Sequence, residues 1–112
     1  MKRLLCVFLV LLLVLSFSAC RQKTTVSADY NDAASFETDL NNGDDLVGKI
    51  VKFECREFEP SSTFGYNIIA GEHLNFCSSE NPNVKKGDVV TVKVTKIESF
   101  LGSWIISYEM VE

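Results

Sequence analysis

From Gly48 to the end of the chain, apolar and polar residues alternate. In the clearest stretch, Val51, Phe53 and Cys55 are separated by single charged residues. Successive side chains of a β-strand point to opposite faces, so this period of two predicts strands that are buried on one face only. The pattern limits this part of the chain to a small β structure.

The alternation predicts five short strands, centred on residues 51–56, 66–70, 73–77, 90–95 and 104–110. Residues 59–63 should end the first strand, because Pro60 lacks a backbone N–H donor and the neighbouring Ser and Thr favour turns. Gly71-Glu72 predicts a tight turn, and Phe100-Leu101-Gly102 predicts the last hairpin.

Ahead of the strands, residues 32–42 predict one short helix. Asn31 or Asp32 can cap its start, and Asn41-Asn42-Gly43 can end it in a left-handed conformation. Phe36 and Leu40 are four residues apart, so both should face the core.

The first nineteen residues have the composition of a cleaved export signal. Lys2 and Arg3 precede an apolar run, residues 4–15, and the small residues Ser18 and Ala19 precede Cys20. As a helix, a run of about twelve residues covers roughly 18 Å, which is short of the ~30 Å hydrocarbon core. We therefore expect residues 1–19 to be removed.

The segment Phe17-Ser18-Ala19-Cys20 resembles the lipobox of bacterial lipoproteins, although Phe17 stands where that family most often has Leu. The resemblance implies a diacylglyceryl group on the Cys20 sulfur, cleavage before Cys20, and a further acyl chain, such as palmitate, on the new amino group. It implies a protein anchored on the extracytoplasmic face of the bacterial cell membrane. A plain cleaved signal and an uncleaved anchor remain alternatives.

Residues 20–30 are polar and predict a flexible tether, which leaves residues 31–112 as one small domain. Without the signal the chain has 93 residues, and nine Lys and Arg stand against fifteen Asp and Glu, a formal charge of −6. This acidity argues against a nucleic-acid partner and against adhesion to anionic lipid headgroups.

Three segments carry a resemblance to a known fold family: Gly48-Lys49-Ile50-Val51, the run from Val84 to Val90 with its Lys-Gly-Asp turn, and Trp104-Ile105-Ile106. They are similar to the tRNA-anticodon-type OB family of small bacterial lipoproteins and secreted proteins, over roughly residues 46–111. The resemblance implies a mainly β domain, a five-stranded OB-fold barrel, whose open end the helix around Phe36 would plug. An immunoglobulin-like or SH3-like sandwich is the alternative.

Cys55 and Cys77 are the two cysteines left in the domain. Export would let a disulfide between them persist, but Cys55 is in phase with the inward residues of its strand and Cys77 is not. The sequence is therefore compatible with a disulfide between Cys55 and Cys77 and also with two buried free thiols. His73 and Cys77 would lie about 13 Å apart in one strand, too far to share a metal. Nor does the run from Asp29 to Ala34 have the oxygen ligands of a calcium loop. We expect no metal and no cofactor.

The candidate ligand face is the outward side of the first strand, where Lys52, Arg56 and Phe58 are joined by Lys93 from the fourth strand. A second candidate surface combines residues 64–67 with residues 71–73. The chain contains no catalytic motif and one His, so no enzyme activity is expected. The sequence favours a binding module for a protein or oligosaccharide partner, or else an accessory subunit of an envelope enzyme or transporter complex, or an enzyme of another type.

Replacing Cys20 tests the anchor. Cys20→Ala should move the protein out of the membrane fraction, because a lipobox thiol carries the acyl chains that anchor it. Cell fractionation and mass spectrometry of the mature N-terminus measure both effects. An unchanged membrane fraction with no lipid mass would contradict the assignment.

Overall fold

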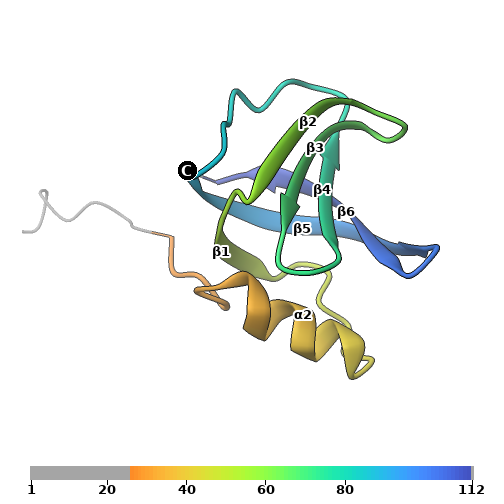
Figure 1. Ribbon diagram of the computed structural model, residues 1–112. Helices are drawn as coiled ribbons and strands as arrows, with labels where there is room; N and C mark the ends of the chain where they lie inside the picture. Colours follow the sequence, from red (N-terminus) through yellow and green to blue (C-terminus); the bar gives the residue numbers. More distant parts are fainter. Residues whose placement is uncertain (1–25, 112) are drawn as a thin grey trace, which may run out of the picture.

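The structure, a computed structural model, describes residues 26–111 (Figure 1). The expected signal (1–19), the lipobox Phe17–Cys20 and residues 20–25 of the expected tether lie outside the described residues. The elements in chain order are α2 (Ala33–Asn41), β1 (Ile50–Glu54), β2 (Glu57–Ser62), β3 (Gly65–Ala70), β4 (Leu74–Ser78), β5 (Val89–Phe100) and β6 (Ser103–Met110). Within residues 26–111, no helix is long and apolar enough to cross a membrane.

The described chain is mainly β, and its six strands form one curled sheet, a half-barrel, in the order β1-β5-β6-β4-β3-β2. Every neighbouring pair is antiparallel except β4 and β6, which run parallel. The helix α2 lies across one open end of the curled sheet (Figure 1).

The strand count differs from the expected five, because residues 57–62 form a strand where the sequence predicted an interruption at Pro60. Two features make room for this proline. β2 pairs with β3 only, and the register of that pair shifts between Glu59 and Ser62. A proline at the edge of a sheet and beside a bulge removes no ladder hydrogen bond.

β1 and β2 are separated only by Cys55 and Arg56, where the chain exchanges one neighbouring strand for another. The Cys55 N–H donates to the carbonyl of Asp88, just before β5, over 2.7 Å. The next N–H, of Arg56, donates to the carbonyl of Ile69 in β3 over 2.9 Å. This bend therefore places β1 and β2 at opposite ends of the strand order.

The helix has the predicted signals at both ends. Asp32 is the N-cap, and its carboxylate accepts a 2.7 Å hydrogen bond from the Ser35 N–H. Gly43 follows the C-cap with φ +89°, a conformation that glycine adopts without strain. Phe36 and Leu40 are both buried, as their spacing predicted.

The core is built around Phe76 in β4. Its ring stacks on Phe53 of β1 at a centroid distance of 4.2 Å. It also meets Phe36 of α2 at 6.1 Å and Tyr108 of β6 at 6.2 Å. One side chain thus contacts residues from three other elements, and the helix closes the core through Phe36.

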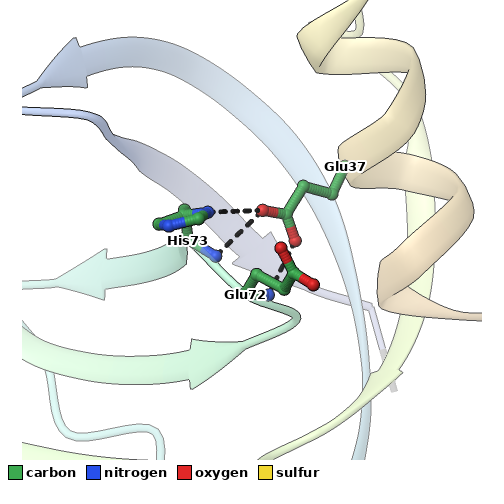
Figure 2. Close-up of side chains that lie close together, drawn as sticks. All are labelled: Glu37, Glu72 and His73. Atoms are coloured by element: carbon green, nitrogen blue, oxygen red, sulfur yellow. Dashed lines mark hydrogen bonds and ion pairs between the residues drawn. The ribbon is translucent and has the colours of Figure 1, made fainter.

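Glu37 attaches α2 to the turn between β3 and β4 (Figure 2). Its carboxylate is buried and accepts hydrogen bonds from the N–H of Glu72 at 2.8 Å and of His73 at 2.9 Å. Gly71 precedes this pair with φ +55°, and a Cβ there would collide with the Glu37 carboxylate. A larger residue at position 71 would therefore have a strained φ and would displace the Glu37 carboxylate from its present position.

Tyr30 belongs to the folded domain, although the sequence predicted that it lies in the tether. Its N–H donates to Ile50 and its carbonyl accepts from Lys52, so it lies along β1. Its hydroxyl donates to Asp39 of α2 over 2.6 Å, and this hydrogen bond to a carboxylate raises the pKa of Tyr30 to about 12. The folded domain therefore includes Asp29 and Tyr30, which composition alone assigned to the tether.

The central position of Phe76 predicts a large effect of its truncation. Phe76→Ala should lower the free energy of unfolding by about 3–5 kcal/mol, because the cavity removes contacts with three aromatic rings. Urea denaturation measures this change. Leu101→Ala is the matched control, since Leu101 is 88% exposed and its truncation should change stability by less than about 0.5 kcal/mol. Equal effects of the two substitutions would contradict the packing described.

Candidate functional site

An open groove of about 750 Å³ lies between β1, the start of α2 and the turn that precedes β5; we call it the β1 groove. Its lining residues are Asn31, Asp32, Ala33, Ala34, Lys52, Phe53, Glu54, Cys55, Arg56, Gly71, Lys86, Gly87 and Val89. Four separate segments of the chain therefore contribute to one site.

Three cationic side chains line the β1 groove. Lys52 lies on the outward face of β1, Arg56 at the bend after it, and Lys86 in the turn before β5, and all three are exposed. In the described part of the chain, no ion pair involves Lys52 or Arg56. Lys86 lies 3.7 Å from Glu57, but both side chains are largely exposed, so this pair contributes little. All three cations can therefore bind an anion.

The backbone fixes the places of these cations. Gly87 donates its N–H to the carbonyl of Cys55 over 2.8 Å, and this bond brings the Lys86 turn against the bend that carries Arg56. Gly87 has φ +93°, which a glycine adopts freely. The N–H of Lys52 is bonded to the carbonyl of Tyr30, so the segment that leads into α2 runs beside β1 and forms the opposite wall.

Two carboxylates, Asp32 and Glu54, also line the groove. The N–H of Ser35 donates to the Asp32 carboxylate and lowers the pKa of Asp32, so this group stays ionised while it caps α2. The groove thus has three positive and two negative side chains. It suits a ligand that carries anionic groups together with neutral hydrogen-bonding groups.

The structure brings together only part of the predicted ligand face. Lys52 and Arg56 line the groove, and Lys86 lines it as well. The sequence predicted that Lys86 lies in a turn before a strand, but it did not predict that this turn belongs to the site. Lys93 is an exposed neighbour on β5, opposite Ile50, and does not line the groove. Phe58 is half-buried on β2 and stacks on Tyr66 at a centroid distance of 6.4 Å, so it belongs to the packed sheet.

The second predicted surface is also only partly exposed. Asn67 is buried, and its side-chain amide donates to Asn75 over 2.9 Å. Phe64 in the β2–β3 turn is exposed and packs edge-on against Phe100 at the end of β5, with ring centroids 5.4 Å apart. Together with Leu101, the rings of Phe64 and Phe100 form an exposed apolar surface, which we call the aromatic tip. Phe64 is distant from the other two residues in the sequence, so the sequence did not predict this surface.

Cys55 and Cys77 are free thiols in the structure, and both are buried. Cys77 lies in β4, which pairs with β3 and β6, whereas Cys55 lies at the bend after β1. The two cysteines are therefore not in neighbouring strands. Burial raises the pKa of Cys77 to about 11, and burial is also the main cause of the raised pKa of Cys55. Both thiols are therefore poor nucleophiles at neutral pH.

One thiol, that of Cys55, lines the groove, and its raised pKa keeps it protonated at neutral pH. His73 lies outside the lining, beside Glu37. Comparisons of the chain with protein-family models, with curated proteins and with solved structures found no match.

Thiol titration tests the state of the two cysteines in a fragment of residues 27–112, which contains no other cysteine. At pH 8 a thiol reagent should react slowly with the native fragment, because the raised pKa leaves little thiolate and burial blocks access. In denaturant without reductant, two thiols per chain should react at once. A count of zero would show a disulfide between Cys55 and Cys77.

Proposed function

We propose that the protein is a lipid-anchored extracytoplasmic binding module with an OB-type fold, and that it binds an anionic envelope oligosaccharide in the β1 groove. The observation that carries this proposal is the convergence of Lys52, Arg56 and Lys86 on one groove. An acidic saccharide offers carboxylate or phosphate groups to the cations and hydroxyl groups to the neighbouring polar side chains.

The strand order supports the OB-type assignment. If β1 and β2 are counted as one long strand bent at Cys55 and Arg56, five strands remain. The first three then form an antiparallel meander, and the third and fifth run parallel side by side. The long first strand would have hydrogen bonds to β5 at its start and to β3 at its end. This arrangement agrees with the family resemblance of the sequence.

The position of the groove supports a ligand near the membrane. Residues 31–34, which form one wall, follow directly on the segment that would carry the lipid anchor. Eight residues, 21–28, lie between Cys20 and Asp29, the first residue bonded to β1, and if such a segment behaved as a flexible chain it would span on the order of 15–20 Å. A lipid on Cys20 would hold the groove close to the bilayer, near the outer membrane-facing surface or within the inner layer of the envelope.

Binding to oligosaccharides tests the proposal. An acidic oligosaccharide should shift the amide resonances of Lys52, Arg56 and Lys86, and its affinity should fall as salt is raised. The double variant Lys52→Ala/Arg56→Ala should weaken binding at least about tenfold, because each lost charged hydrogen bond contributes on the order of 1 kcal/mol. Lys96→Ala is the matched control, since Lys96 is exposed, is paired with Glu98 and does not line the groove.

Three results would contradict this proposal: equal binding by the double variant, turnover of the saccharide, or resonance shifts confined to other surfaces. A separate titration, with an envelope protein in place of the saccharide, tests the second candidate. Shifts at Phe64, Phe100 and Leu101 on addition of an envelope protein would favour the second candidate, an accessory subunit of an envelope enzyme or transporter complex. The exposed aromatic tip is the observation that favours it, because apolar side chains at the surface suit a protein partner.

A further inference from the structure

Glu37, Glu72 and His73 form a second cluster of polar groups, on the junction between α2 and the β3–β4 turn (Figure 2). One carboxylate oxygen of each Glu and one ring nitrogen of His73 all lie within 4.8 Å of one another. Carboxylate oxygen and imidazole nitrogen are both common ligands of divalent metals. None of the three residues lines the β1 groove, although the neighbouring Gly71 does.

The charges of the cluster are unbalanced. The Glu37 side chain is only 8% exposed, and the carboxylate of Glu72 lies close to it. In residues 26–111, the ion pairs include no Lys or Arg beside either carboxylate. Two neighbouring carboxylates, one of them removed from water, are stabilised when a cation lies between them. His73 supplies such a charge only when it is protonated.

The geometry also suits a metal ion. The Nδ1 atom of His73 is 3.4 Å from Oε2 of Glu37. Zinc binds nitrogen and oxygen at roughly 2.0–2.2 Å in a tetrahedron, so two of its ligands lie about 3.3–3.5 Å apart. The two backbone N–H bonds fix the Glu37 carboxylate and leave a second lone pair on each oxygen. Glu37 is therefore a preorganised ligand.

We propose that Glu37, Glu72 and His73 bind a divalent cation of the zinc class. The mixture of one imidazole nitrogen with carboxylate oxygens favours Zn²⁺ over Mg²⁺ and Ca²⁺, which prefer oxygen ligands alone. The exposed His73 and Glu72 side chains leave the cation a path from solvent, and water completes its coordination. The site does not depend on the oligosaccharide-binding function proposed above.

Such a cation would join two elements of the fold. Glu37 comes from α2, whereas Glu72 and His73 come from the turn between β3 and β4. A ligand that binds the folded state and not the unfolded state stabilises the fold by mass action. Zinc should therefore raise the unfolding temperature, which gives a readout that requires no knowledge of the protein's ligand.

The test uses the processed chain, purified from membranes in a nonionic detergent without a polyhistidine tag. Isothermal titration with ZnCl₂ should show one site per chain, and zinc should raise the unfolding temperature, whereas MgCl₂ should do neither. His73→Ala and Glu72→Gln should each weaken zinc binding at least about tenfold. Both side chains are exposed, so the metal-free variants should unfold close to the parent temperature.

Glu80→Gln is the matched control, because Glu80 is an exposed acid in the loop after β4, outside the cluster. Its zinc affinity should equal that of the parent chain. The proposal is overturned if the parent chain takes up no zinc at micromolar to millimolar concentrations. It is equally overturned if His73→Ala and Glu72→Gln bind zinc as tightly as Glu80→Gln does, since the metal would then lie elsewhere.

Discussion

The packing of Phe36 against Phe76 is the contact on which the rest of the structure depends. A curled sheet of short strands leaves its core open at one end, and apolar side chains there would face water. α2 closes this end because Phe36 and Leu40 share one helical face. Once the helix is held there, its first residues form a wall of the β1 groove, and Glu37 reaches the β3–β4 turn.

The bend at Cys55 and Arg56 is the second constraint, and it determines both topology and site. The backbone of Cys55 is bonded to the turn before β5 by two hydrogen bonds, to Asp88 and from Gly87. These bonds hold Cys55 against the β5 side of the bend, and they also bring Lys86 beside Arg56. The next N–H, of Arg56, donates to Ile69 of β3, so the neighbouring strand changes at the point where the cationic side of the groove is assembled.

Short-range patterns predicted much of this fold, whereas contacts between distant segments did not follow from sequence. The period of two located most strands, and the spacing of Phe36 and Leu40 located the buried face of the helix. β2 was not predicted because it contains Pro60. A strand tolerates a proline there only because β2 lies at the end of the strand order. Lys86 and Tyr30 were missed for a related reason: each reaches β1 or its bend through backbone hydrogen bonds, which leave no trace in residue type.

The two proposed sites depend on local charge and not on the net charge of the chain. The acidic balance of the chain argues against nucleic acid and anionic lipid headgroups, but at physiological ionic strength charges act over about 8 Å. An anion in the β1 groove therefore responds to Lys52, Arg56 and Lys86 more than to distant carboxylates. At the other junction, Glu37 and Glu72 produce the opposite local charge. The two proposed sites therefore differ in local charge: cations outnumber carboxylates in the groove, and carboxylates predominate at the junction.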